Sequence, residues 1–281
     1  MSMRNSTIQT DLDAVVGRTF TVRDVVSPHR VAALAATLDV DPPADGSLPL
    51  LWHWVLFQDW QKRSTLGPDG HPARGGFMPA IAGMERRMWA GSAVLCNRPL
   101  RVGEAVERRS TIAAATLKHG RTGALAFVQI HHDIGPPGES AITETLDVVY
   151  RAADDPAVGA ATPSPVPPGA RTRSVVADAL TLFRYSAATG NSHRIHYDFE
   201  YVTNTEHYPG LVVHGPLQAT WLADFARTCR GDAPISYFAC RARRAAFAGT
   251  LLTLSAIATE SSLDLALRDA DGTICMTGSA R

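Results

Sequence analysis

The chain has 281 residues, of which 45% are apolar and 19% charged, a composition typical of a packed globular protein with one large domain or two ordinary ones. Lysine and arginine together number 27, as do aspartate and glutamate, so we expect neither nucleic acid nor a membrane surface as a partner. The opening letters MSMRNSTIQTD lack the apolar core of a signal peptide, and no run reaches the roughly 20 apolar residues of a spanning helix. These features predict a cytoplasmic protein.

The cysteines point to reduced thiols. Cys96, Cys229, Cys240 and Cys275 lie far apart and form no C-x-x-C pair. This spacing argues against both a thiolate zinc site and a disulfide framework.

Two helices are predicted early in the chain. The segment 27–38 has Ser27 at the N-cap, Pro28 at the first helical position and apolar residues at helical spacing. The segment LPLLWHWVLFQDW (48–60) is apolar nearly all round, which favours a buried helix beginning at Pro49. From about residue 96 to 152, alternating letters between glycine-rich turns predict strands.

A proline-rich segment divides the chain. The letters DDPAVGAATPSPVPPGA (154–170) contain five prolines and no hydrophobic period, so they predict an extended connector. We therefore expect an N-terminal half over residues 1–153 and a C-terminal half over residues 171–281.

The second half repeats the order of the first. A histidine-containing loop leads into an apolar helix (216–229), and four strand-like segments follow. Pro49 and Trp54 correspond in this repeat to Pro216 and Trp221. A sheet wrapped around one central helix is the hot-dog arrangement, so the pattern predicts an α+β chain with a double hot-dog fold. Two unrelated α+β domains are the alternative.

Two neighbouring segments carry a family resemblance. The letters GNSHRIHYD (190–198) and YPGLVVHG (208–215) resemble the hydratase loop and helix start of MaoC-like acyl-thioester dehydratases. The resemblance is strongest to the two-domain branch with mitochondrial-type 3-hydroxyacyl-thioester dehydratase and the mesaconyl-C4-CoA and itaconyl-CoA hydratases. It extends to GGFMPA, RRMWAGS and PLRVG in the first half. It implies a hydro-lyase that acts on an acyl-CoA.

The chemistry of water addition makes sense of these residues. A base must deprotonate water near Cβ, an acid must deliver a proton to Cα, and donors must stabilise the thioester oxygen. His196 can carry the proton because the imidazole pKa lies near neutrality, and Asn191 is expected to hold the water. Pro216 places Gly215 at the helix cap, where its unpaired N–H can bind the thioester oxygen.

The loop departs from the family pattern at its first polar position. MaoC-like loops have an aspartate there, which can act as a base, whereas this chain has Asn191. We therefore expect His196 to take the proton from water, with Asp198 or Glu206 orienting the ring or sharing the proton. The structural alternatives are that Asn191 serves only the Gly-Asn turn and that Gly215 is only a helix cap.

Arginine and aromatic residues suggest how substrate is held. Arginine binds carboxylate and phosphate through paired hydrogen bonds, so it can hold coenzyme A phosphates or a second carboxylate on the acyl group. The alternative for the arginines is a solvated basic strand edge. The alternative for His214 is a cap or packing role. The substrate-binding residues that we expect are Arg184, Tyr185, Arg194, Tyr208, His214, Arg241 and Arg243.

The histidines also raise the question of a metal. His193 and His196 are three apart in what reads as a loop, and neither cysteine nor paired carboxylates complete a ligand set at ordinary spacing. We expect no metal, and no cofactor besides the coenzyme A of the substrate. The first half has no histidine in the corresponding loop (39–51), so we expect it to cover the acyl tunnel without catalysing.

The sequence thus predicts reversible hydration of a short enoyl-CoA, with a branched dicarboxylic substrate favoured. A 3-hydroxyacyl-ACP dehydratase of fatty-acid or polyketide synthesis is the alternative enzyme. A thioesterase is disfavoured because its carboxylate near the helix is missing. A non-catalytic acyl-CoA-binding protein is the alternative of another class. Pairing of two chains into a homodimer through sheet edges remains open.

Overall fold

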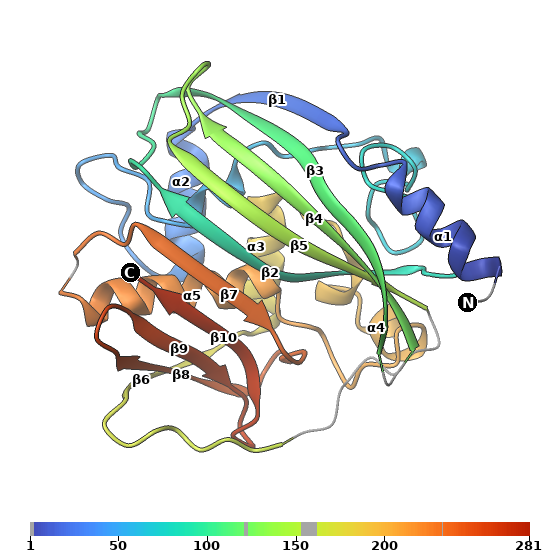
Figure 1. Ribbon diagram of the computed structural model, residues 1–281. Coiled ribbons are helices and arrows are strands. Elements are labelled where there is room, and N and C mark those ends of the chain that lie inside the picture. The colour runs from blue at the N-terminus through green and yellow to red at the C-terminus, as the bar shows by residue number, and fades with distance from the viewer. Residues whose placement is uncertain (1–2, 121–122, 153–161, 232) are drawn as a thin grey trace.

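The computed structural model describes residues 3–120, 123–152, 162–231 and 233–281 (Figure 1). The strands of the first half are β1 (Thr19–Val25), β2 (Arg86–Cys96), β3 (Ala105–Gly120), β4 (Gly123–Gly135) and β5 (Ile142–Arg151). Those of the second are β6 (Arg171–Val176), β7 (Tyr237–Ala242), β8 (Leu251–Ala258), β9 (Leu263–Arg268) and β10 (Ile274–Ala280). The helices are α1 (Met3–Asp13), α2 (Pro28–Leu38), α3 (Ala179–Thr189), α4 (Phe199–Asn204) and α5 (Gly215–Cys229), with 3-10 turns η1 (Trp52–Val55), η2 (Arg63–Thr65) and η3 (Arg194–His196).

All ten strands form one antiparallel sheet. The order is β1-β3-β4-β5-β2-β7-β10-β9-β8-β6, and β2 pairs with β7 from Gly91 opposite Arg241 to Leu95 opposite Tyr237. Outward from that junction, the first half runs β5, β4, β3, β1 and the second runs β10, β9, β8, β6. The two halves therefore repeat one strand order about the junction, and the predicted α+β double hot-dog fold is confirmed.

The central helix of the second half is α5. It packs against β8, β9 and β10 and also reaches β2 and β7 (Figure 1). Leu217, Leu222 and Ala226 are completely buried on it, which is why its sequence is apolar on most of its circumference. His214 is the N-cap and Gly215 the first helical residue, one position earlier than the sequence predicted.

The expected helix at Pro49 is wrong. Within the described residues, the segment 48–60 forms only the 3-10 turn η1, flanked by Leu51 and Phe57 at φ values of 71° and 57°, in the left-handed region. The Asp24 carboxylate accepts the N–H of Phe57 at 2.7 Å, so a side chain replaces helical bonding. Leu51 and Trp52 are still buried, and an unbroken apolar run cannot distinguish such a buried turn from a helix.

Other segments of the first half agree better with the sequence. Helix α2 begins at Pro28 as predicted, and β3, β4 and β5 lie where the alternation placed them. The strands β1 and β2 were not predicted. In β2 the register shifts between Trp89 and Gly91, and a Cβ at Gly91 would lie 2.3 Å from the Cys240 carbonyl oxygen. This bulge and close approach interrupt the alternation that identifies a strand.

The expected connector 154–170 lies partly outside the described residues, which resume at 162. Its described part is extended and runs beside the β9–β10 turn, where Pro163 forms an isolated bridge with Thr273. The carbonyl of Ser164 accepts a hydrogen bond from Arg268 Nε at 2.7 Å. In the described part of the chain, no helix is long and apolar enough to cross a membrane.

Candidate active site

A cavity of about 1170 Å³ is lined by both halves of the chain. Its wall in the second half includes Asn191, His193, His196, Tyr208, Gly215 and Arg243. Its wall in the first half includes Phe57, His71, Arg87, Trp89, Phe127 and Val148. The residues predicted to carry the chemistry therefore share their cavity with residues of the first half, which we expected to cover the acyl tunnel without catalysing.

The loop after α3 brings Asn191 to this cavity. Helix α3 ends at Gly190, whose φ of 66° is the left-handed conformation that glycine adopts without strain. The Asn191 N–H then donates to the Ser186 carbonyl at 2.9 Å, and its Oδ1 accepts the backbone N–H of His193 at 3.0 Å. The side-chain oxygen of Asn191 therefore stabilises the turn, and its NH₂ group remains a hydrogen-bond donor.

His196 is held as a neutral imidazole. Its Nδ1 lies 2.7 Å from the carbonyl oxygen of Val212, which can only accept, so Nδ1 carries the proton and Nε2 has the lone pair. Burial lowers the pKa of His196 to about 4. At neutral pH the ring can therefore accept a hydrogen bond or a proton through Nε2.

His214 and Tyr185 support His196 from behind. The His214 ring stacks on the His196 ring at a centroid distance of 3.6 Å, and Tyr185 packs on His214 at 4.9 Å. His214 Nε2 lies 2.9 Å from Ser186 Oγ, and burial holds the His214 pKa well below its usual value. His214 and Tyr185 were expected to bind substrate, but neither belongs to the cavity wall in the described part of the chain. They are packing groups that fix His196.

Gly215 lies where its backbone can meet a ligand. As the first residue of α5, its N–H belongs to the turn that has no intrahelical acceptor, at the positive end of the helix dipole. A Cβ at this position would lie 2.5 Å from Trp89 Cε3. Trp89 of β2 therefore requires glycine here, and Gly215 belongs to the wall of the cavity shared by both halves.

Four expected site residues are placed elsewhere. Asp198 accepts the Tyr201 N–H as the N-cap of α4, and the Arg194 guanidinium donates to Asp198 at 2.7 Å while lying 4.1 Å over the Tyr201 ring. Glu206 pairs with Arg86 at 2.9 Å. Arg184 is exposed on α3. In the described ranges, none of Asp198, Glu206, Arg194 and Arg184 belongs to the cavity wall.

Three other substrate-binding candidates do line the cavity. Tyr208 is buried, and burial raises the pKa of its phenol, so it stays a neutral hydrogen-bond donor. Arg241 and Arg243 belong to the wall at the end of β7, and Arg243 Nε donates to Thr277 Oγ1 at 3.2 Å. These side chains contribute hydrogen-bond donors to the cavity wall.

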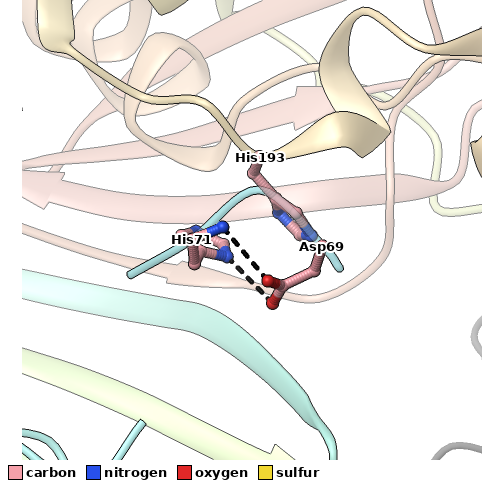
Figure 2. A group of neighbouring side chains, drawn as sticks. All are labelled: Asp69, His71 and His193. Carbon is pink, nitrogen blue, oxygen red and sulfur yellow. Dashed lines mark hydrogen bonds and ion pairs between the residues drawn. The ribbon is translucent and has the colours of Figure 1, made fainter. Parts of the chain in front are cut away.

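A loop of the first half that was not predicted to belong to the site also reaches it. In the segment 67–74, the Asp69 carboxylate accepts both the backbone N–H of His71 at 3.1 Å and its Nδ1 at 3.2 Å (Figure 2). The His71 ring lies 4.2 Å from the His193 ring, between centroids. The potential metal-ligand atoms of Asp69, His71 and His193 lie within 4.8 Å of one another. The signal for this group in the sequence is the Asp-Gly-His turn pattern at 69–71.

The sequence also matches the family of hydroxyacyl-thioester dehydratases type 2 over residues 51–248. It is 42% identical over 272 residues to a mesaconyl-C(4)-CoA hydratase of Chloroflexus aurantiacus, covering 95% of this chain and 96% of that protein. The chain belongs to the hydroxyacyl-thioester dehydratase type 2 family.

Solved structures share the fold of this family member. HtdX of Mycobacterium tuberculosis has a TM-score of 0.68 at 20% identity, covering 94% of this chain and 99% of that chain. A MaoC-like dehydratase from Phytophthora capsici has a TM-score of 0.68 at 14% identity, covering 97% of each chain. Both likenesses support the double hot-dog fold seen in the sheet.

The family is one of hydro-lyases, so the predicted enzyme class is confirmed. For a hydro-lyase, the cavity provides a neutral imidazole at His196, amide donors at Asn191 and a backbone N–H at Gly215. The N–H suits a developing oxyanion because it costs no reorganisation during the reaction. The carboxylate expected near His196 from Asp198 or Glu206 is absent from the described part of the cavity wall.

Proposed function

We infer that this hydroxyacyl-thioester dehydratase family member reversibly hydrates a short enoyl-CoA that carries a second carboxylate, of the mesaconyl-C4-CoA or itaconyl-CoA type. One observation carries this proposal. Asn191, His196 and Gly215 line the same cavity as Arg241 and Arg243. Groups for water, thioester oxygen and substrate anions are thus gathered in one space.

The charge of the cavity wall supports an anionic substrate. Asp59 is the one carboxylate in the described wall. The arginines of the wall are Arg87, Arg108, Arg151, Arg241, Arg243 and Arg244. Such an excess of guanidinium groups suits both coenzyme A phosphates and a carboxylate on the acyl group. The mesaconyl-C(4)-CoA hydratase relative favours the same substrate class.

The 3-hydroxyacyl-ACP dehydratase remains the second candidate because part of the wall is apolar. Phe20, Phe77, Leu125, Phe127 and Val148 line the cavity. An apolar surface of this kind suits an unbranched alkyl chain better than a short dicarboxylic group.

A turnover assay with mass spectrometry tests the proposal. The panel contains crotonyl-CoA, mesaconyl-C4-CoA, itaconyl-CoA and a medium-chain enoyl thioester on both coenzyme A and acyl-carrier protein. We expect gain of water with the highest kcat/KM on a dicarboxylic CoA thioester. Preference for the medium-chain carrier-protein substrate would favour the ACP dehydratase. Binding without water exchange on any thioester would overturn the enzyme proposal.

A further inference from the structure

The hydratase loop supplies the imidazole of His196, but the hydrogen-bond partner of that ring is the Val212 carbonyl and not a carboxylate. Asn191 cannot be deprotonated at neutral pH, and Asp198 and Glu206 are engaged by Arg194 and Arg86 instead of His196. A base that holds a proton must be stabilised in its protonated form. An imidazole with a carboxylate partner in the cavity wall would meet this requirement.

The loop 67–74 of the first half is held against the hydratase loop by direct hydrogen bonds. The Arg194 N–H donates to the Asp69 carbonyl at 2.9 Å, and Arg194 Nη1 donates to the Pro68 carbonyl at 3.0 Å. Ser192 Oγ donates to the Gly70 carbonyl at 2.5 Å. A Cβ at Gly70 would lie 2.1 Å from the Ser192 carbonyl oxygen, so glycine permits this contact.

The Asp69 carboxylate fixes the tautomer of His71. A carboxylate can only accept, so the contact between Asp69 Oδ2 and His71 Nδ1 places the ring proton on Nδ1 and the lone pair on Nε2 (Figure 2). Burial raises the pKa of Asp69, but the hydrogen bonds and charge of His71 lower it to a greater extent, so the carboxylate is ionised. His71 lines the cavity.

A carboxylate hydrogen-bonded to its ring distinguishes His71 from His196 and His193. Burial lowers the pKa of His196 to about 4 and that of His193 to about 2, and neighbouring imidazoles act in the same direction. Burial also lowers the pKa of His71, and Arg87 adds to this, but Asp69 opposes both. Of these three imidazoles, His71 is the one whose ring contacts a carboxylate in the described part of the chain, so an imidazolium formed there is stabilised directly, as in other carboxylate–imidazole pairs.

We propose that His71 is the catalytic residue that carries the proton between water and Cα, and that Asp69 is its positioning residue. This inference rests on the proposed hydration and revises the expectation that His196 takes the proton. The first half then supplies the function of the carboxylate that Asn191 replaces, while His196 and Asn191 hold the water through hydrogen bonds.

The step balances with one proton carrier. In hydration, Nε2 of His71 takes a proton from water, and the water oxygen bonds to Cβ. The electron pair of the C=C bond moves toward Cα and the thioester oxygen, near the N–H of Gly215. The proton on Nε2 is then delivered to Cα. One O–H bond and the C=C π bond break, one C–O and one C–H bond form, and His71 ends neutral as it began.

A metal ion is the competing use of the same side chains. The ligand-atom spacing of Asp69, His71 and His193 permits it. However, Arg74 Nη2 lies 3.6 Å from Asp69 Oδ2, and the charge of Arg87 also acts on His71 and His193. These guanidinium groups oppose a divalent cation more strongly than the singly charged imidazolium that forms transiently at His71.

The test compares His71→Asn, Asp69→Asn and the control His131→Asn on the best substrate of the turnover panel. Asparagine at 71 retains a donor toward Asp69 but removes Nε2, and His131 is partly exposed on β4 outside the cavity wall. Thermal unfolding and Kd for a non-hydrolysable acyl-CoA analogue check the fold. We expect His71→Asn to lower kcat by about 10²–10⁴ and to abolish deuterium exchange at Cα in D₂O.

Rescue and pH dependence separate catalysis from packing. Asn191→Asp introduces a carboxylate base. Added to His71→Asn, it should raise kcat at least tenfold above that of the His71→Asn single variant. Asp69→Asn removes the charge that raises the His71 pKa. The acid limb of its kcat/KM profile should therefore move to lower pH, with a lower plateau. Rescue with a normal fold would support the proposal.

The outcomes also separate this inference from the proposed function. If the parent exchanges water and His71→Asn keeps this activity within threefold, the roles proposed for His71 and Asp69 would be overturned, while the proposed hydration would stand. Activity lost with a chelator and restored by Zn²⁺ alone would overturn these roles in favour of a metal site. Absence of turnover by the parent protein on the whole panel would instead overturn the proposed function, on which the roles of His71 and Asp69 rest.

Discussion

The two halves of the chain share a strand order but differ in what they place beneath it. The second half retains the long helix α5, whose first turn faces the cavity, whereas the first half has only the 3-10 turn η1 in the corresponding segment. The first half instead has a long connection between η1 and β2, and that connection brings His71, hydrogen-bonded to Asp69, to the cavity wall. Repetition of a sheet therefore does not imply repetition of a site, and each half contributes different chemistry.

Apart from the variants of the loop 67–74, the largest expected effect is at the second-half imidazole His196. His196→Asn keeps an amide donor for the Val212 carbonyl but removes Nε2, so kcat should fall by roughly 10²–10³ while the fold is retained. Stopped assays on the preferred thioester, with Tm as a fold check, measure this. Activity within threefold of the parent would show that the second half contributes only a scaffold at this position.

The next effect tests the contact between the halves at the helix start. Gly215→Ala places a methyl group against Trp89, so we expect the first turn of α5 to shift and kcat to fall by about 10²-fold. Trp89→Leu in the same chain should return most of the activity because it makes room. If the double variant is as inactive as the single one, the loss has a cause other than this contact.

A glycine pair measures the stability of the contact between the two loops. Gly70 and Gly103 have φ values of 87° and 88°, but a Cβ at Gly103 meets nothing within 4 Å. Gly103→Ala should cost about 1 kcal/mol through backbone strain alone. Gly70→Ala should cost about 2 kcal/mol more, because the Ser192 carbonyl must move. Urea unfolding measures both, and equal losses would mean that the loops separate easily.

The buried histidines predict how stability depends on pH. Burial lowers the folded-state pKa of His196 and His132 to about 4, below the usual value near 6.5. Between these values the unfolded chain binds more protons, so the free energy of unfolding should fall as pH decreases from 6.5 to 4, by up to about 1.4 kcal/mol per pH unit for each histidine. Urea midpoints at pH 7.5, 6 and 5 test this. His196→Asn should flatten the dependence.

The smallest effect concerns two arginines of the second half. Arg243 lines the cavity, so Arg243→Gln should raise KM by about tenfold on a dicarboxylic thioester with little change in kcat. Arg184 is exposed on α3, so Arg184→Gln should change KM by less than twofold. A similar rise in KM for both would indicate a general charge effect instead of a local contact.

Local pattern was sufficient for much of the fold. The apolar circumference of α5, Pro28 at the start of α2 and the alternation in β3–β5 each predicted the observed element, because the physical cause lies within the segment. The turn at η1 could not be predicted, because Asp24, from a distant segment, binds the N–H of Phe57. The Gly91 bulge in β2 likewise depends on the approach of Cys240.

The candidate site shows the same limit. Asn191, His196 and Gly215 could be found because one short stretch contains them and resembles a known loop. Asp69 and His71 could not, because their role arises only when the first-half loop contacts Ser192 and Arg194, more than 100 residues later in the sequence. The cap role of Asp198 is local by contrast, since its carboxylate accepts the N–H of Tyr201 three residues later.

The glycine at position 70 has a consequence for folding. Since the carbonyls of Gly70 and Asp69 bind the hydratase loop directly, the cavity acquires all its polar groups only after the two halves have docked. Catalytic competence should therefore appear later than secondary structure when the denatured chain is returned to native conditions. The recovery of enzyme activity would then report the docking of the two halves, a step that circular dichroism, which follows secondary structure, would not detect.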